Sequence, residues 1–227
     1  MILTSGEIAD RLEQVRSRIA CAARQAGREA DSVRLVLASK TQPAAAIEAA
    51  FAAGARDFGE NYVQEAVSKR AMLCDLPIHW HLIGHLQTNK VRAAIETFDV
   101  IQTLDSQRLA NALFRLHPSP PMPVLVEINL AGEPSKSGIE PGAAEELISS
   151  VRERVEVRGL MTIPPVTAPV EGPRRFFCQL RELRDRLVTA TGLGLPELSM
   201  GMTDDFETAI LEGATIVRVG RAVFGER

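Results

Sequence analysis

The residue with the clearest chemical potential is Lys40, which directly follows the mostly apolar run VRLVLAS at residues 33–39. A short run of this composition is typical of a buried strand. A lysine at the end of such a strand is partly removed from water, which disfavours its charged form and lowers its pKa. The neutral amine attacks carbonyl groups, so Lys40 is a candidate for a Schiff base with an aldehyde. Considered alone, Lys40 is better interpreted as an ordinary surface lysine.

Two glycine-containing segments late in the chain are candidates for an anion site. The first, LSMGMTDDF at 198–206, passes from a strand through Gly201 into a helix. The second, VRVGR at 217–221, leaves a strand at Gly220. Free backbone N–H groups at turns of this kind favour a bound phosphate.

Some side chains in the first segment favour a bound phosphate and others oppose it. Ser199 and Thr203 carry hydroxyl groups that can donate to a phosphate. Asp204 and Asp205 would repel a phosphate that pointed directly at them. The alternative is two ordinary glycine turns, with Thr203 or Asp204 as a simple helix cap.

The elements that must position these residues alternate between strands and helices. A helix is predicted from residue 4 to a stop near Gly27, with Thr4 and Glu7 as a capping box. Alternation of this kind predicts a parallel sheet with helical crossovers. We predict strands at 33–39, 57–59, 79–83, 99–103, 124–129, 157–161, 197–200 and 215–219.

Eight such strands predict an α/β fold with a single TIM-type (β/α)8 barrel, preceded by an extra N-terminal helix and spanning residues 1–227 as one domain. An open, doubly wound sheet is the alternative. In a barrel, Lys40 and both glycine segments lie at the carboxyl ends of strands, where active sites form. The proline-rich stretches 118–123 and 164–173 are interpreted as loops.

Composition excludes several classes of protein. The net charge of −3 argues against a nucleic-acid partner, and 45% apolar residues are enough for a normal core. No apolar run is long enough for a membrane span, and the charged N-terminus is unlike a signal peptide. Three widely spaced cysteines, Cys21, Cys74 and Cys178, argue against disulfides and are expected to be buried. Cytoplasm is the expected compartment.

Seven blocks of the sequence resemble the pyridoxal phosphate homeostasis protein family. They cover nearly the whole chain in order, which makes the resemblance specific. The blocks are LVLASKTQP (35–43), FGENYVQE (58–65), HWHLIGHLQTNK (79–90), EINLAGEPSKSG (127–138), GLMTIPP (159–165), LSMGMTDDFETAI (198–210) and VRVGRAVFG (217–225).

The resemblance implies a barrel similar to the N-terminal domain of alanine racemases, with pyridoxal 5′-phosphate (PLP) held as a Schiff base on Lys40. It implies that Arg218 lies near the pyridine nitrogen, with Asn61 and Lys136 as weaker candidates to line the pocket. The residues implied near the phosphate are Ser199, Gly201, Thr203 and Gly220. Members of the family commonly carry serine at the position of Thr203, and the hydroxyl is retained here.

The resemblance also implies a role in PLP homeostasis rather than robust catalysis. An arginine beside the pyridine nitrogen leaves that nitrogen unprotonated and makes the ring a weaker electron sink. The alternative is a small PLP-dependent amino-acid racemase, which needs two groups for proton transfer. Lys40 is one candidate, and the single tyrosine, Tyr62, is not a convincing second. Without a second domain, we expect a monomer, and PLP-requiring apo-enzymes are its candidate partners.

Three histidines at 79, 81 and 85 raise the question of a metal site. His79 and His81 share one face of a predicted strand, and His85 lies beyond it. A metal site needs a further ligand of defined geometry, and neither a cysteine nor a carboxylate is evident in this region. We therefore expect no metal site here.

Overall fold

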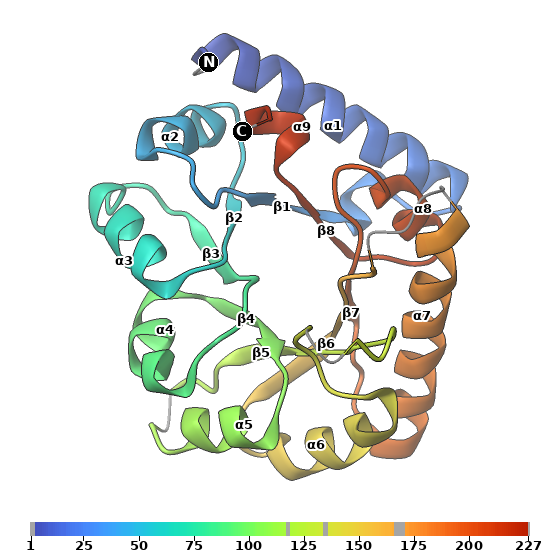
Figure 1. Ribbon diagram of the computed structural model, residues 1–227. Helices are drawn as coiled ribbons and strands as arrows, with labels where there is room; N and C mark the ends of the chain where they lie inside the picture. Colours follow the sequence, from blue (N-terminus) through green and yellow to red (C-terminus); the bar gives the residue numbers. More distant parts are fainter. Residues whose placement is uncertain (1–2, 117–118, 134–135, 166–170, 227) are drawn as a thin grey trace.

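The computed structural model describes residues 3–116, 119–133, 136–165 and 171–226. Its parallel strands follow one another around a closed barrel in sequence order, and β8 pairs with β1 (Figure 1). The strands are β1 (Arg34–Ala38), β2 (Asp57–Glu60), β3 (His79–Leu82), β4 (Val100–Leu104), β5 (Pro123–Glu127), β6 (Glu156–Met161), β7 (Glu197–Ser199) and β8 (Ile216–Val219). The predicted (β/α)8 barrel is confirmed, and the open sheet is excluded.

Helices connect the strands and form a ring around the barrel (Figure 1). They are α2 (Ala44–Ala52), α3 (Val63–Met72), α4 (Val91–Thr97), α5 (Gln107–Phe114), α6 (Ala144–Val151), α7 (Glu171–Thr191), α8 (Phe206–Leu211) and α9 (Arg221–Phe224). Short 3-10 helices occur at Ala30–Ser32, Thr88–Lys90 and Pro141–Ala143. Each crossover returns the chain to the same end of the barrel, so the carboxyl ends of the strands lie together.

The predicted N-terminal helix is present as α1 (Ser5–Gln25). Its capping box is formed, because Glu7 N–H donates to Thr4 Oγ1 at 3.3 Å and Thr4 N–H donates to the Glu7 carboxylate at 2.8 Å. The helix lies in the outer ring between α2 and α8, beside α9 (Figure 1). Its buried face consists of Ile8, Leu12, Val15, Ile19, Ala22 and Ala23. Because α9 is only one turn long, α1 supplies the apolar cover that a longer final helix would provide.

The core has two layers. A large outer layer of apolar side chains lies between the strands and the helices. A small inner cluster, formed by Val36, Leu125, Met161 and Ile216, fills part of the barrel interior. Polar side chains that are also fully buried, such as Gln102 and Ser199, occupy other interior positions and need hydrogen-bond partners there.

Two local expectations are wrong, and parts of the two proline-rich stretches lie outside the described residues. Pro173 is not in a loop but near the start of α7, where the missing N–H costs no helical hydrogen bond. Cys21 and Cys74 are exposed and Cys178 is half-buried, because they lie off the core-facing sides of their segments; all three are free thiols. Residue 118 of the first proline-rich stretch and residues 166–170 of the second are not described. Every described helix is too short or too polar to cross a lipid bilayer.

Candidate functional site

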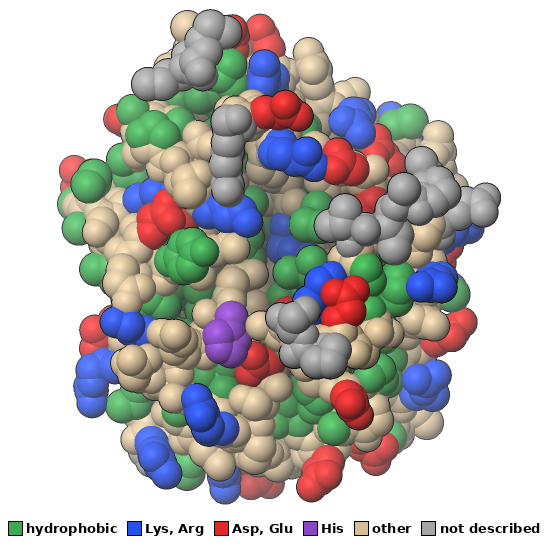
Figure 2. All heavy atoms as spheres, in the orientation of Figure 1, with side chains coloured by type: hydrophobic (Ala, Val, Ile, Leu, Met, Phe, Trp, Pro, Cys, Tyr) green, Lys and Arg blue, Asp and Glu red, His purple; other side chains and the backbone are tan. Residues whose placement is uncertain are grey.

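A cavity of about 540 Å³ opens at the carboxyl ends of the strands. Its walls come from segments that follow five strands: Lys40 after β1, Asn61 after β2, Ile83 after β3, Ile163 after β6 and Thr203 after β7. Arg218 and Gly220, at the end of β8, also line it. The face of the ring in Figure 2 is hollowed near the barrel axis, with lysine and arginine side chains around the hollow. The site thus lies where a (β/α)8 barrel places its functional residues.

The backbone before Lys40 is held by a buried ion pair. Lys69, on α3, donates to the carbonyl oxygen of Ser39 at 2.8 Å and to Glu60 Oε1 at 2.7 Å. Ser39 Oγ donates to the same Glu60 oxygen at 2.7 Å. The side chains of Lys69 and Glu60 are 7% and 0% exposed, so the pair lies in the interior. Burial raises the pKa of Glu60 more than the Lys69 ammonium lowers it.

The backbone after Lys40 is held by the same network. Glu65 Oε1 accepts from the Thr41 N–H at 2.5 Å and from Lys69 at 2.6 Å. Thr41 has a φ of 64°, a left-handed conformation that is costly for a β-branched residue. The residues on both sides of Lys40 are therefore fixed. Lys40 itself is half-buried and lines the cavity from this rigid backbone.

Arg218 carries a buried positive charge on β8, the strand that pairs with β1. Its Nη1 donates to Ser199 Oγ at 2.6 Å and its Nη2 donates to the carbonyl oxygen of Thr162 at 2.9 Å. Burial lowers the pKa of Arg218 to about 10, with the Glu127 carboxylate acting in the other direction. The guanidinium therefore stays charged at neutral pH. A fixed donor of this kind can hold a hydrogen-bond acceptor but cannot exchange protons with it.

Glu127 is an acidic residue whose negative charge raises the pKa of Arg218. It ends β5, is 6% exposed, and its Oε2 has no hydrogen-bond partner in the described structure. Burial raises its pKa to about 7, Asp105 adds to the rise, and Arg218 opposes it. Glu127 therefore changes charge close to physiological pH.

The two glycine segments follow β7 and β8, as predicted, and both are packed too closely for a side chain. Gly201 has a φ of 91°, and a Cβ there would lie 2.6 Å from the Cβ of Ala209 and 2.9 Å from the Cα of Phe206. At Gly220, a Cβ would lie 2.9 Å from the carbonyl oxygen of Ala38. These contacts bring the backbone of both turns close to the end of the barrel.

The two acids that argued against a phosphate also line the cavity, but both carboxylates have partners. Asp205 Oδ1 accepts from the Met202 N–H at 2.6 Å, which turns the carboxylate into its own loop. Asp204, which is exposed, forms an ion pair with Arg221. Their charges are partly compensated, so they oppose an anion at this turn less than their sequence positions suggest.

The structure brings five of the seven predicted site residues onto one cavity: Lys40, Asn61, Thr203, Arg218 and Gly220. Ser199 is fully buried inside the barrel, where its hydroxyl accepts from Arg218 and donates to Gln102 Oε1 at 2.6 Å. Gly201 is buried behind the loop that lines the cavity. The weaker candidate Lys136 pairs with Glu133 at 3.1 Å and is not among the lining residues.

Sequence reasoning missed the residues that support the site. Lys69, Glu60 and Glu65 have no motif of their own, although Glu60 and Glu65 lie in the block FGENYVQE, next to Asn61. It also missed a carboxylate beside the histidines: Asp57 Oδ1 lies 3.0 Å from ring nitrogens of both His79 and His81. The expectation that no carboxylate joins them is therefore wrong.

The comparisons with known proteins agree with this geometry. The sequence profile of the family described as "Alanine racemase, N-terminal domain" matches residues 11–227. The pyridoxal phosphate homeostasis protein of Pseudomonas aeruginosa is 46% identical over 224 residues, covering 97% of this chain and 96% of that protein. The proteins of the same name from Aquifex aeolicus and Escherichia coli K12 are 44% and 43% identical, again over more than nine-tenths of each chain.

The chain belongs to the pyridoxal phosphate homeostasis protein family.

A solved structure of a similar protein supports the assignment. The structure of PipY from Synechococcus elongatus, described as having PLP bound, is 40% identical, covers 96% of this chain and all of that one, and has a TM-score of 0.85. Alanine racemase from Corynebacterium glutamicum is 20% identical with a TM-score of 0.71, and this chain covers 62% of it. That second likeness shows the fold alone.

Proposed function

We propose that this protein binds PLP through Lys40 and takes part in the homeostasis of that cofactor in the cytoplasm. The observation that carries the proposal is that Lys40, Arg218 and the Gly220 turn line the same cavity. Membership of a family named for PLP homeostasis, with one relative described as PLP-bound, supports the choice of ligand.

The residues present fit this cofactor in size and in chemistry. A cavity of about 540 Å³ lies within the range of ordinary small-molecule sites. The Thr203 hydroxyl and the close-packed turns at Gly201 and Gly220 would hold the phosphate. Arg218 would hold the pyridine nitrogen as an acceptor, and Asn61 would contact the ring. When bound, the cofactor supplies an aldehyde that condenses with the Lys40 amine.

The protein's own residues favour holding the cofactor over turning over an amino acid. Arg218 keeps its proton, so it cannot pass one to the ring nitrogen, and carbanion chemistry is restrained. Tyr62 is 62% exposed and is absent from the described residues that line the cavity. The racemase alternative needs a second proton-transfer group, and Tyr62 is not placed to serve as one.

The deciding experiment is an absorption spectrum of the purified protein after incubation with PLP and removal of the excess. We expect a band near the visible edge that borohydride changes, together with a mass increase after reduction. Both signals should be lost in Lys40→Ala and kept in Lys90→Ala, which changes a lysine outside the cavity walls. A colourless wild-type protein, or equal signals in Lys40→Ala, would contradict the proposal.

Carrier and enzyme differ in what they do with the cofactor. Mixing the loaded protein with a PLP-requiring apo-enzyme should restore that enzyme's activity, while alanine enantiomers remain unchanged. Steady interconversion of the enantiomers by wild-type protein, abolished in Lys40→Ala, would favour the racemase. We further propose that residues 1–227 act as one domain and as a monomer, which sedimentation of the untagged protein tests.

A further inference from the structure

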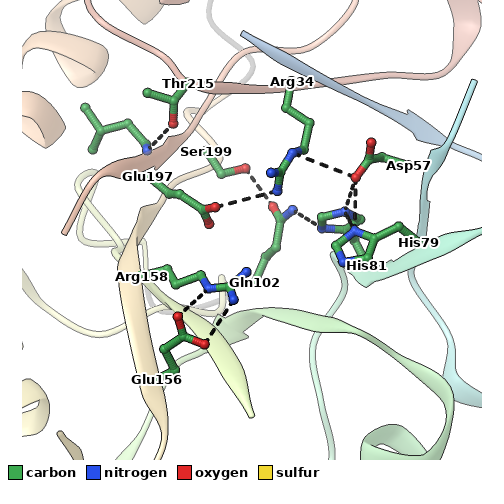
Figure 3. A network of polar contacts seen from close by, with 11 residues as sticks. Arg34, Asp57, His79, His81, Gln102, Glu156, Arg158, Glu197, Ser199 and Thr215 are labelled. Carbon is green, nitrogen blue, oxygen red and sulfur yellow. Dashed lines mark hydrogen bonds and ion pairs between the residues drawn. The ribbon is translucent and has the colours of Figure 1, made fainter. Parts of the chain in front are cut away.

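Three ligand atoms meet at the amino-terminal end of the barrel, the end opposite to the cavity that Lys40 lines. Asp57 starts β2, and His79 and His81 lie on β3, next to it in the sheet. Asp57 Oδ1, His79 Nδ1 and His81 Nε2 are each 3.0 Å from the other two. Figure 3 shows the three side chains pointing toward one another. Their reactive atoms form an equilateral triangle.

Hydrogen bonds alone cannot satisfy this triangle while Asp57 is an ionised carboxylate. A ring nitrogen of histidine is either a donor or an acceptor, never both. If both nitrogens donate to Asp57, the 3.0 Å contact between His79 and His81 is donor against donor. If one nitrogen gives its proton to the other, a bare nitrogen faces the carboxylate oxygen. While Asp57 is ionised, one close polar contact is therefore unfavourable without a further group.

A cation in front of the triangle would satisfy all three atoms at once. Adjacent ligands of an octahedral ion, at about 2.1 Å from the metal, are about 3.0 Å apart, whereas tetrahedral ligands at that distance are about 3.4 Å apart. The observed triangle matches one face of an octahedron. Two imidazoles and one carboxylate on such a face are a donor set suited to divalent transition metals.

We propose that Asp57, His79 and His81 form a binding site for one octahedral divalent transition-metal ion, such as Co²⁺, Ni²⁺ or Fe²⁺.

The ion can reach the site from solvent. The side chains of His79 and Asp57 are 38% and 21% exposed, whereas His81 is fully buried and anchors the triangle. A groove of about 670 Å³ under α1 also reaches Asp57. This side of the triangle leaves room for water molecules as the remaining ligands.

The charges near the site limit its affinity. Arg34 Nε lies 3.8 Å from Asp57 Oδ1, and Arg34 Nη1 lies 3.6 Å from Glu197 Oε1 (Figure 3). These are long ion pairs of a side chain that is 40% exposed, so Arg34 can turn away when an ion binds. Its positive charge repels the ion, which makes Arg34 a useful site for a variant that should bind more tightly.

Ion binding would also change the orientation of a buried amide. Ser199 Oγ accepts from Arg218, so it donates to Gln102 Oε1, and Gln102 Nε2 donates to His81 Nδ1 at 3.0 Å. His81 consequently carries its proton on Nε2. A metal at Nε2 requires the proton on Nδ1 instead, and Gln102 must then present its oxygen. Metal binding is thus expected to turn the Gln102 amide.

The test uses the untagged full chain titrated with Co²⁺. Visible absorption reports the coordination of the ion, and equilibrium dialysis counts the ions bound. We expect one ion per chain with a weak six-coordinate spectrum. His79→Gln and Asp57→Asn should each lower the affinity at least tenfold, and Arg34→Gln should raise it. The control is His85→Gln, because that exposed histidine bonds to Asp105 on other elements and should leave binding unchanged.

Several results would overturn the proposal. One is that the wild-type protein shows no saturable binding of Co²⁺. The others are that both His79→Gln and Asp57→Asn keep the wild-type affinity, or that His85→Gln loses as much affinity as they do. A lower affinity in Arg34→Gln would show that the ion does not bind at Asp57. His81 is not substituted because its buried ring also supports the fold, and circular dichroism of each variant checks that it is folded. The experiment does not involve PLP, so its outcome is independent of the function proposed above.

Discussion

The ammonium of Lys69 lies 2.8 Å from the carbonyl oxygen of Ser39, the residue immediately before Lys40. Lys40 is therefore positioned through its backbone by a second lysine, which does not line the cavity. The second lysine is in turn held by Glu60 and Glu65, at 2.7 Å and 2.6 Å. The support is separate from the cofactor that Lys40 is proposed to bind.

Replacing Lys69 by methionine tests this support. The change leaves the buried carboxylate of Glu60 without its charge partner, which typically costs about 3 to 5 kcal/mol of unfolding free energy. Urea unfolding measures the loss, and the absorption band of bound PLP should weaken in the variant that remains folded. The double variant Lys69→Met with Glu60→Gln should recover part of the stability. A stable single variant with an unchanged band would contradict the role of Lys69.

The buried carboxyl group of Glu127 predicts a pH dependence of stability. Its pKa is about 7 in the folded protein and near 4.5 when unfolded, so the folded state binds the proton more tightly. The protonated form stabilises the fold below about pH 4.5, and this contribution is lost as the pH rises through about 7. Two to three pKa units correspond to about 3 kcal/mol. Glu127→Gln should therefore be more stable than wild type at pH 8.5 and equal to it near pH 4.5 in urea unfolding. A parallel pH dependence in both proteins would contradict this prediction.

Arg218 and Ser199 form a pair that tests the placement of the pyridine nitrogen. Arg218→Glu puts a carboxylate where the guanidinium lies, which favours a protonated ring nitrogen and should shift the absorption band of the PLP-loaded protein. Ser199→Ala removes the hydroxyl that Arg218 Nη1 contacts at 2.6 Å and that donates to Gln102 Oε1. Loss of this charged hydrogen bond costs about 1.5 to 3 kcal/mol, and the shift of the band should be smaller. An unchanged spectrum in folded Arg218→Glu would place the nitrogen elsewhere.

The glycine at position 201 predicts a specific steric effect. In Gly201→Ala, the new Cβ would lie 2.6 Å from the Cβ of Ala209, at a φ of 91° that alanine rarely adopts. Overpacking of this kind costs about 1 to 3 kcal/mol, and the displaced turn should bind PLP more weakly. Gly142→Ala is the matched control, because its Cβ would meet nothing within 4 Å. Thermal unfolding and PLP titration of both variants make the comparison; equal behaviour would contradict it.

The strands and the carboxyl-end location of the site could be predicted because they depend on local pattern. The valine- and leucine-rich run before Lys40 and the run at 124–129 have the composition of buried strands, and alternation with helices fixes their parallel order. The same rules place Lys40, Asn61 and Thr203 at one end of the barrel without any knowledge of side-chain contacts.

The contacts between side chains could not be predicted, because they depend on the register between distant strands. Lys69 reaches Ser39 across 30 positions, and Ser199 reaches Gln102 across 97. Asp57 meets His79 because β2 and β3 align these two residues directly. The sequence alone shows Ser199 only as a serine with a hydroxyl that could bind an anion. In the folded chain, that hydroxyl accepts a hydrogen bond from Arg218.

The closed sheet has a consequence for a protein that is proposed to bind a cofactor. Since β8 pairs with β1, the described barrel has no unpaired strand edge whether or not the cavity is filled. Unpaired edges are the usual templates for self-association. The unloaded form should therefore persist in the crowded cell without aggregating, ready to accept a reactive aldehyde again.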